Sequence, residues 1–278
     1  MPALAAYGVF VLWPIIQTLR YSFYNWDGVA PGTWAGLANF RTVFTNGQLL
    51  AVLEHSFELL VFFSVIPVTL GLAVATVMRR FVTGRMAALA RTVLFLPQVV
   101  PLVAAGIAWS WMLSTNGAIN QILSFFGLHS LTQSWLAGFN TALPAVGVIG
   151  AWVLLGLCTV LLLAGMTKVD TSLYEAAQLD GAGPVREFVS ITLPALRQEL
   201  IVCVTVTVIA ALSAFDIVYI ATQGGPGNAT MVPGLEIYQL AFYNRQVGLA
   251  SALAVVLMVL VIACITPIQW FGRRGAER

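Results

Sequence analysis

Long apolar stretches separated by short polar connections dominate the chain. A helix that crosses the ~30 Å hydrocarbon layer of a bilayer needs about 20 residues, at a rise of about 1.5 Å each. Six stretches come close to or exceed this length: residues 3–19, 59–77, 92–113, 143–166, 200–220 and 249–271. We therefore predict an all-α, polytopic membrane protein with six transmembrane helices.

The first stretch, residues 3–19, is the shortest and has no basic residue before it. A secretory signal peptide would show a charged start and a cleavage site of small residues. The stretch instead runs into WPIIQTLRYSFYNW, whose aromatic residues suit a membrane interface. We interpret it as a true first membrane helix, and the natural start of the protein is left open.

Composition supports the membrane class. Of 278 residues, 59% are hydrophobic and 9% are charged, whereas soluble domains carry about a quarter charged residues. A single soluble core cannot bury this much apolar surface at this chain length. We expect one membrane domain over residues 1–278, with a core from about residue 55 to 271, in contact with lipid.

Charge and cysteine content exclude other classes. A net charge of +2, with no basic run, gives no reason to expect a nucleic-acid partner. Cys158, Cys203 and Cys264 all lie inside apolar runs, so we expect them to behave as small buried hydrophobic residues. Their spacing indicates neither a metal site nor a disulfide framework.

Lysine and arginine positions predict the orientation, because cytoplasmic connections carry the excess of basic residues. The connections after the second, fourth and sixth stretches hold ten basic residues, whereas the opposite side holds three, Arg20, Arg41 and Arg245. We therefore expect the side with ten basic residues, and with it both termini, to be cytoplasmic. The ten are Arg79, Arg80, Arg85, Arg91, Lys168, Arg186, Arg197, Arg273, Arg274 and Arg278.

Proline residues interrupt several of the stretches. Each removes a backbone donor and tends to kink a helix. Kinks in membrane helices are tolerated where neighbouring helices or a cavity satisfy the freed groups. The pattern alone leaves packing irregularity and a hinge role both open. The prolines concerned are Pro67, Pro97, Pro101, Pro144 and Pro267.

The polar stretch YEAAQLDGAGPVREF, residues 174–188, lies between the fourth and fifth apolar runs. Ser172 followed by Glu175 fits a capping box, in which the serine accepts from the third helical amide and the glutamate reaches back. This spacing predicts a helix over residues 173–180.

A tight turn and a second helix follow. Gly181 suits the position just past a helix end, where φ is positive, and Pro184 suits the first position of the next helix. Leu193-Pro194 predicts the end of that helix before the fifth membrane helix. The element of about residues 170–194 is either an amphipathic link or a docking element for a soluble partner.

The chain lacks a nucleotide-binding loop. The pattern G-x-x-x-x-G-K-[ST] does not occur, and the single lysine, Lys168, lies in GMTKVD. If the protein uses ATP, the ATPase must therefore be a separate subunit.

The sequence EAAQLDGAGPVREFVSITLP resembles the EAA motif of ABC importer permeases. Three further stretches, FLPQVVPLVAAGIAWSWML, AFDIVYIATQGGPGNAT and ASALAVVLMVL, are similar to the sugar-uptake branch of that family. The resemblance covers the chain from about Asn39 onward. It departs where many relatives have a further proline after Leu193-Pro194, because this chain has Arg197, Gln198 and Glu199. The matching positions are Glu175, Ala176, Ala177, Asp180, Gly181, Phe188, Ile191, Leu193 and Pro194.

The resemblance implies a type I importer membrane domain in a bacterial plasma membrane. It would form half of a pore with a second permease, most often a different chain, and would import a sugar or sugar-like solute by alternating access. The solute could be a disaccharide, an amino sugar or a compound of the glycerol-phosphate type. Two partner subunits would bind ATP and Mg, and an extracytoplasmic solute-binding protein would deliver the solute. This chain would itself hold no cofactor or metal and would not be an enzyme.

In this family the EAA segment is the coupling helix, which lies in a cleft of the ATP-binding subunit. The resemblance implies that Leu173, Tyr174 and Ala177 form its apolar face, that Glu175 makes polar contacts with the partner, and that Gly181 permits the turn. The other positions carried over to this site are Ala176 and Asp180.

Substrate contacts are less well indicated. Asp216 lies near the outer end of the fifth apolar run, where it is either a functional carboxylate or a hydrated helix end. Tyr219, Trp109 and Trp152 could offer flat faces to sugar rings, or could serve packing and the interfacial belt.

An ion-coupled secondary transporter of a small polar solute is the alternative function. Such proteins usually carry ionisable residues within the membrane for proton or sodium coupling. Asp216 is the one candidate here, and the sequence offers it no obvious partner.

Overall fold

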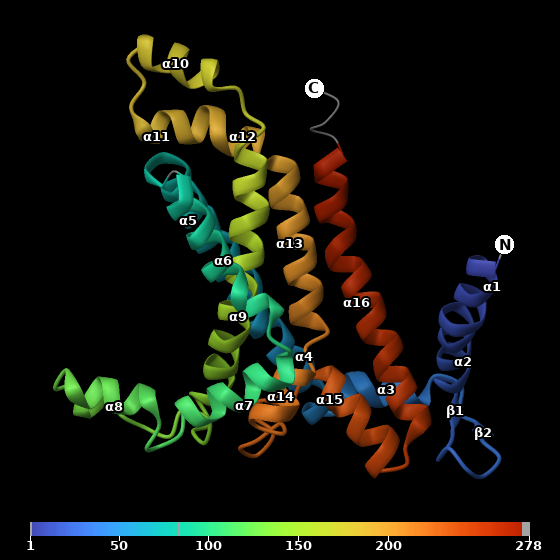
Figure 1. Ribbon diagram of the computed structural model, residues 1–278. Helices are drawn as coiled ribbons and strands as arrows, with labels where there is room; N and C mark the ends of the chain where they lie inside the picture. Colours follow the sequence, from blue (N-terminus) through green and yellow to red (C-terminus); the bar gives the residue numbers. More distant parts are fainter. Residues whose placement is uncertain (1, 83, 274–278) are drawn as a thin grey trace.

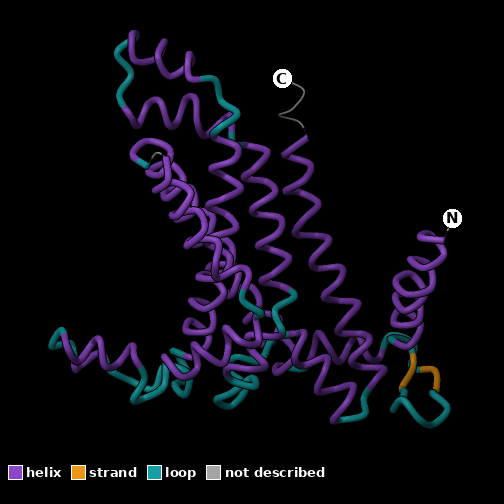
Figure 2. The backbone as a smooth tube through the Cα atoms, in the orientation of Figure 1, coloured by secondary structure: helices purple, strands orange, loops and turns teal. Residues whose placement is uncertain are grey.

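The computed structural model describes residues 2–82 and 84–273, and this part of the chain is almost entirely helical (Figures 1 and 2). A short hairpin, β1 (Tyr24–Asn25) and β2 (Thr33–Trp34), pairs antiparallel with Tyr24 opposite Trp34. Four helices are long and apolar enough to cross a membrane, and six cross if each of two bent helix pairs counts as one span. The all-α, polytopic class is therefore confirmed.

The first span stands apart from the others. Its helix runs without interruption through Pro2–Tyr21, and none of it is buried inside the chain. In Figure 1 it lies beside α16 and away from α5 and α9. Its segments, and the short helix that follows the hairpin, are α1 (Pro2–Tyr7), η1 (Gly8–Leu12), α2 (Trp13–Tyr21) and α3 (Ala38–Thr45).

Three spans match the predicted stretches but extend further. The second is one continuous helix of 35 residues, much longer than residues 59–77, and the Asn46 side chain caps it by accepting from the amide of Gln48. The fourth span is confirmed almost to the residue. The segments are α4 (Gly47–Leu60), η2 (Val61–Val65), α5 (Ile66–Phe81), α9 (Ala142–Met166) and α16 (Val247–Arg273).

The prediction of one helix over residues 92–113 is wrong. The chain forms α6 (Gly84–Val99) and α7 (Leu102–Met112), which meet at a bend of 96°. Pro101 explains the break, because a proline disfavours helical backbone at the residue before it and donates no hydrogen bond. Figure 1 shows α7 lying across the end of the bundle, beside α14.

The fifth span also differs from its prediction, residues 200–220. The membrane helix α13 (Arg197–Leu212) ends early, and a separate short helix, α14 (Asp216–Ala221), follows the break. No proline or glycine marks this break, so the sequence pattern could not reveal it. The outer connection continues through α15 (Pro233–Tyr238) and η5 (Gln239–Tyr243).

We predicted that Leu193-Pro194 ends the helix before α13, but the helix continues through these two residues to Ala195. The helix α11 (Pro184–Glu187) continues as a π turn, η4 (Phe188–Thr192), and then as α12 (Leu193–Ala195). The π turn shifts the hydrogen-bond register, which lets the proline be accommodated without a break. The chain instead bends by 70° at Leu196, where ψ is 4°.

The connections that follow spans two and four lie at one end of the molecule, together with the end of span six (Figure 1). In Figure 1 the turn between α5 and α6, the helix α10 (Thr171–Leu179) and the last turn of α16 lie at that end. The hairpin, α7, α14 and α15 lie at the other end with α8 (Ala118–Phe125). This arrangement is the one expected for six crossings. Arg274 and Arg278 lie outside the described residues.

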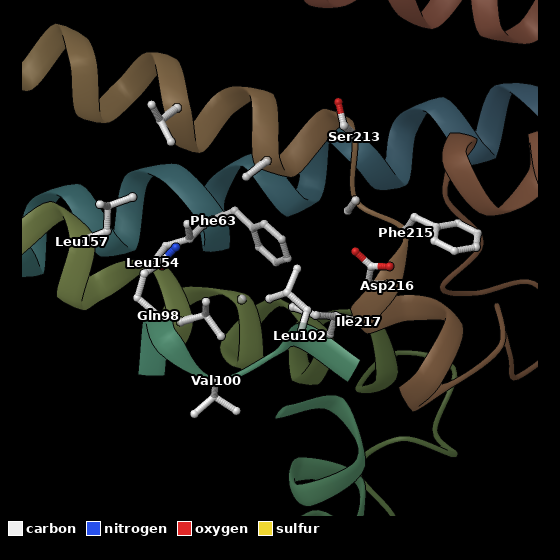
Figure 3. Close-up of a pocket in the computed structure, with 15 residues that line it drawn as sticks. Phe63, Gln98, Val100, Leu102, Leu154, Leu157, Ser213, Phe215, Asp216 and Ile217 are labelled. Carbon is white, nitrogen blue, oxygen red and sulfur yellow. The ribbon is translucent and has the colours of Figure 1, made fainter. Parts of the chain in front are cut away.

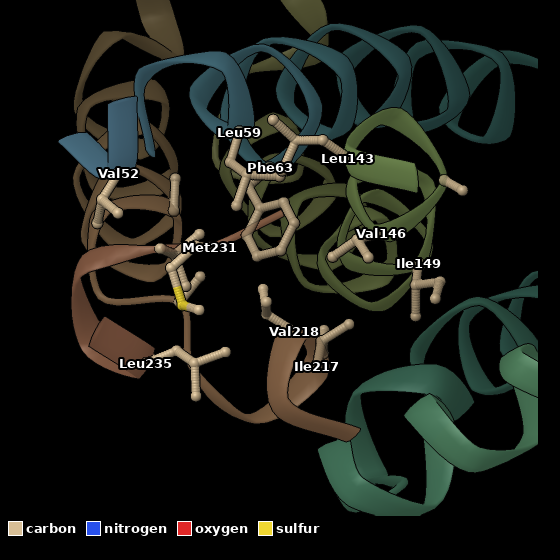
Figure 4. Close-up of a cluster of buried hydrophobic side chains, with 14 of the residues drawn as sticks. Val52, Leu59, Phe63, Leu143, Val146, Ile149, Ile217, Val218, Met231 and Leu235 are labelled. Atoms are coloured by element: carbon tan, nitrogen blue, oxygen red, sulfur yellow. The ribbon is translucent and has the colours of Figure 1, made fainter. Parts of the chain in front are cut away.

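The helix α9 lies at the centre of the packing. Its N-terminal half joins the largest buried cluster of the described residues, in which Leu143, Val146 and Ile149 meet Phe63 and Val218 (Figure 4). Its C-terminal half packs in a second cluster that contains the buried side chains of Cys158 and Cys203. The expectation of small buried hydrophobic residues is confirmed for these two cysteines, whereas Cys264 on α16 is only half-buried.

Glycines on α9 let other helices approach at backbone distance. A Cβ placed on Gly156 would lie 1.9 Å from the Leu94 carbonyl oxygen of α6. A Cβ on Gly150 would lie 2.0 Å from the Phe63 ring of η2. Small residues at such contacts are what membrane helices need, since lipid supplies no hydrophobic drive to bring them together.

We expect Gly156→Ala to destabilise the protein by about 1–3 kcal/mol, because a methyl group would force apart the backbones of α6 and α9. Thermal unfolding in detergent measures this loss. Gly8→Ala is the matched control, since nothing lies within 4 Å of a Cβ at Gly8. Equal unfolding midpoints for Gly156→Ala and the unmodified protein would contradict the packing argument.

Candidate functional site

The polar segment between spans four and five folds as a helix, a turn and a second helix. Asp170 caps α10, and its carboxylate accepts from the backbone amide of Ser172 at 3.0 Å. The predicted capping box is therefore wrong, because Ser172 and Glu175 both lie inside the helix. The amide of Ser172 lowers the pKa of Asp170 below its ordinary value.

The predicted turn after this helix is confirmed. Gly181 has φ +74°, a backbone conformation that glycine adopts without steric cost. The amide of Ala182 donates to the Ala177 carbonyl at 2.9 Å and the amide of Gly181 to the Gln178 carbonyl at 3.0 Å. These bonds satisfy carbonyls at the helix end and turn the chain back into α11.

The helix α10 projects from the bundle, and none of its residues is buried (Figure 1). Leu173 is 53% exposed and Leu179 is 90% exposed. Glu175, Ala176 and Asp180 are exposed as well. The side chains that face inward are Tyr174 and Ala177, both half-buried. The outer face of α10 is thus open to a partner, whereas Tyr174 is turned toward span two.

A cavity of about 320 Å³ lies between spans two to five, toward the end of the molecule that holds α7 and α14 (Figure 1). Phe63, Leu154 and Leu157 line its inner part with other apolar side chains (Figure 3). The breaks after α6 and after α13 both open onto it, since Val100 and Ser213 are among its lining residues. Irregular backbone at membrane depth is tolerated where it lines such a space.

Three polar side chains line this cavity. Gln98 lies at one end in Figure 3, and Ser213 and Asp216 lie at the other. The Gln98 side-chain oxygen is buried and has no hydrogen-bond partner among the described residues. Asp216 is exposed, and it is not in a membrane helix as predicted but at the first position of α14. The cavity therefore offers polar groups at both ends and apolar walls between them.

The predicted aromatic residues lie near the cavity but do not line it. Trp109 and Trp152 form an edge-to-face pair with ring centroids 5.6 Å apart. Tyr219 stacks on Phe215, a lining residue, at 5.3 Å, and Tyr238 meets both rings edge-on. Tyr219 therefore contacts a lining residue of the cavity, Phe215, without lining the cavity itself.

Sequence analysis missed Gln98, Ser213 and Phe215. Gln98 carried a usable signal, because it is an amide between two prolines in the apolar stretch FLPQVVP. Ser213 and Phe215 carried none, because their position depends on the break after α13.

Comparison with known proteins identifies the family. The model of the binding-protein-dependent transport system inner membrane component matches residues 67–274, which is most of the chain. The chain belongs to this family of transport proteins.

Two relatives illustrate the similarity. A probable ABC transporter permease protein of Bacillus subtilis, YurN, is 32% identical over 279 residues, which cover 100% of this chain and 95% of the relative. The diacetylchitobiose uptake system permease protein NgcF of Streptomyces coelicolor is 35% identical over 270 residues, which cover 93% of this chain and 76% of the relative.

A solved structure shares the fold. A crystal structure of a bacterial ABC transporter involved in the import of the acidic polysaccharide alginate superposes with a TM-score of 0.84 at 20% identity. The match covers 99% of this chain and 93% of the solved chain. Permeases of this family are membrane translocation subunits whose ATPase belongs to partner subunits. The ion-coupled alternative has no support from these relatives.

We expect Asp170→Ala to fray the first turn of α10, because the Ser172 amide loses its acceptor, whereas Asp170→Asn keeps one. Hydrogen exchange at the first amides of α10 measures this. Because the pKa of Asp170 is lowered on folding, the charged cap is present above the ordinary pKa and is lost as pH falls through the lowered value. Unchanged exchange in Asp170→Ala would count against Asp170 as the cap.

Proposed function

We propose that this chain forms one half of the pore of an ATP-driven importer for a sugar or sugar-like solute such as a disaccharide or an amino sugar. Relatives named for diacetylchitobiose uptake and for trehalose/maltose transport, the latter 32% identical over 270 residues, support this solute class. The solute enters through alternating access of the cavity to the two sides of the membrane.

The observation that carries the proposal is the exposure of α10. A short helix with Leu173 and Leu179 in solvent, held by a cap and a glycine turn, is a preformed projection that residues 2–82 and 84–273 leave uncovered. We assign Leu173, Glu175, Ala176, Asp180 and Gly181 to the contact with an ATP-binding subunit. Two such subunits hold ATP and Mg, and this chain transmits their movement.

The cavity is our candidate for the solute site. Sugar hydroxyl groups need donors and acceptors, and Gln98, Ser213 and Asp216 supply both. Apolar sugar faces need flat or aliphatic walls, and Phe63 and Phe215 supply these. We place Trp109 and Trp152 behind this site as supporting residues rather than as direct contacts.

An aromatic series leads from the cavity to the outer surface. Phe215, Tyr219 and Tyr238 contact one another, and Tyr238 also contacts Phe242 and Tyr243, which are 74% and 68% exposed. We assign this series to the delivery of solute from an extracytoplasmic binding protein. A solved relative in this fold class was crystallised with its periplasmic protein and an alginate pentasaccharide.

The exposed first span suits a second permease. No part of it is buried, and Phe10 and Leu4 are 79% and 70% exposed. The span also keeps its distance from α5 and α9 in Figure 1. We propose that a second, different permease packs against the exposed surface of the first span, with lipid around both. Both termini and α10 then face the cytoplasm, on the side that the basic residues predict.

The proposal is tested by purification and reconstitution. The chain should co-purify with an ATPase of separate sequence and a second permease, and the complex should take up a disaccharide in proteoliposomes only when ATP is supplied. Uptake that follows a proton or sodium gradient without ATP would overturn it.

We expect Gly181→Asp to leave the protein in the membrane and to abolish stimulation of ATP hydrolysis by the binding protein, because a side chain at φ +74° strains the turn that sets α10. The ATPase rate with and without binding protein measures this. Gly183→Asp is the control, since Gly183 has φ −80° and no atom within 4 Å of a Cβ. Normal transport by Gly181→Asp would argue against α10 as the coupling element.

We expect Gln98→Leu to slow solute uptake by about two- to tenfold, the effect of one lost neutral hydrogen bond, and Asp216→Asn to slow it by about tenfold or more. Uptake into proteoliposomes measures both. Gln121→Leu is the control, because Gln121 lies on α8 and bonds the Asn116 carbonyl away from the cavity. Solute affinity of the isolated binding protein should not change. Unchanged uptake in both variants would remove the cavity as the solute site.

A further inference from the structure

One phenol oxygen joins the projecting helix α10 to the end of span two and to η4, the segment that precedes span five. Arg79 donates from its guanidinium to the Tyr174 oxygen, and the guanidinium carbon lies 4.1 Å from the centroid of the Tyr174 ring. The same oxygen is 2.9 Å from the Thr192 hydroxyl. Tyr174 thus combines a cation–π contact with two hydrogen bonds at one position.

The two residues that Tyr174 contacts lie at the ends of helical segments that lead into the membrane spans. Arg79 is in the last turn of α5, at the inner end of the 35-residue helix of span two. Thr192 is 5% exposed and ends η4, four residues before the 70° bend at Leu196 that leads into α13. A displacement of α10 is therefore applied directly to span two through Arg79, and to span five through η4 and the bend at Leu196.

The surroundings of this junction are loosely packed. A cavity of about 220 Å³ lies beside it, lined among others by Arg80, Gln178 and Glu187. The α10 residues nearest to Tyr174 in sequence, Leu173 and Glu175, are exposed. Packing alone therefore does not fix α10 against the bundle, and the polar contacts of Tyr174 are needed to set its position.

We propose that Tyr174 is a positioning residue that couples the movement of α10 to spans two and five through Arg79 and Thr192. This inference rests on the proposed function and deepens it, because it assigns Tyr174 to transmission inside the chain rather than to the docking face. A rigid link is required, since a partner that moves α10 changes the pore only if α10 cannot slip against the membrane helices.

Conservative variants separate the link from folding. Tyr174→Phe keeps the ring over Arg79 and loses both hydrogen bonds, and Thr192→Val removes the hydroxyl that bonds the Tyr174 oxygen, at equal volume. Tyr7→Phe and Thr167→Val are matched controls. Tyr7 is 54% exposed in the first span, and the Thr167 hydroxyl bonds only the Ala164 carbonyl of its own helix end.

The experiment uses the complete complex of this chain, its second permease, the ATPase and the binding protein in proteoliposomes. The readout is the ratio of ATPase rates with and without liganded binding protein. We expect Tyr174→Phe to lower this ratio at least about fivefold, the lower end of typical coupling between sites, while the ATPase co-purifies in unchanged proportion. The double variant with Thr192→Val should be no worse than Tyr174→Phe alone, because both changes break one junction.

The outcomes distinguish this inference from the proposed function. If the unmodified complex shows no stimulation, the proposed function and the link are both wrong. If it shows stimulation and Tyr174→Phe is within about twofold of it, the link alone is wrong. Loss of ATPase co-purification in Tyr174→Phe, or an equal effect in Tyr7→Phe, would also overturn the link, because it would indicate docking or general stability.

Hydrogen exchange provides a second readout that does not depend on ATP. In the complex without nucleotide, Tyr174→Phe should speed exchange at the amides of α10 and leave α9 unchanged. Equal exchange of α10 in the variant and the unmodified protein would overturn the role of Tyr174 in holding this helix.

Discussion

The close approach of neighbouring helices to α9 is the constraint on which the rest of this structure depends. In a bilayer the apolar surfaces of helices gain little by leaving lipid, so packing depends on contact at short range. Gly150 and Gly156 provide that contact, the first for the Phe63 ring and the second for the backbone of α6. Because spans two and three are fixed against α9 at these glycines, their backbones can depart from regular helix away from the contact, as at the bend between α6 and α7.

The same helix leads directly to the projecting element. α9 ends at Met166, and Asp170 starts α10 after only a short turn. A side-chain cap at one end and a positive-φ glycine at the other give α10 a defined shape, although none of its residues is buried. Tyr174 then connects this exposed helix to Arg79 at the end of span two and to Thr192 in η4. Local hydrogen bonds thus give α10 its shape, and the inward side chain of Tyr174 sets its position.

At the opposite end, two interrupted spans enclose the cavity. The break at Pro101 turns α7 across the bundle, and the break after Leu212 starts α14. The cavity lies between them, and its polar residues, Gln98, Ser213 and Asp216, all come from the neighbourhood of these breaks. Gln98 is in the last turn of α6, whereas Ser213 and Asp216 come from the break after α13, so one helix end and one interruption together give the space its polar character.

The sequence by itself determined the membrane class, the alternation of the connections between the two ends of the molecule, the Gly181 turn and the family. These features could be predicted because hydropathy and turn chemistry act within one segment. The tertiary structure decided the rest. It placed the cap at Asp170 instead of Ser172, ended α13 at Leu212 and brought Gln98 to the cavity. It also joined Tyr174 to Arg79, 95 residues away in the chain. Such features depend on which distant segments meet, and the local spacing of residue types carries no information about those meetings.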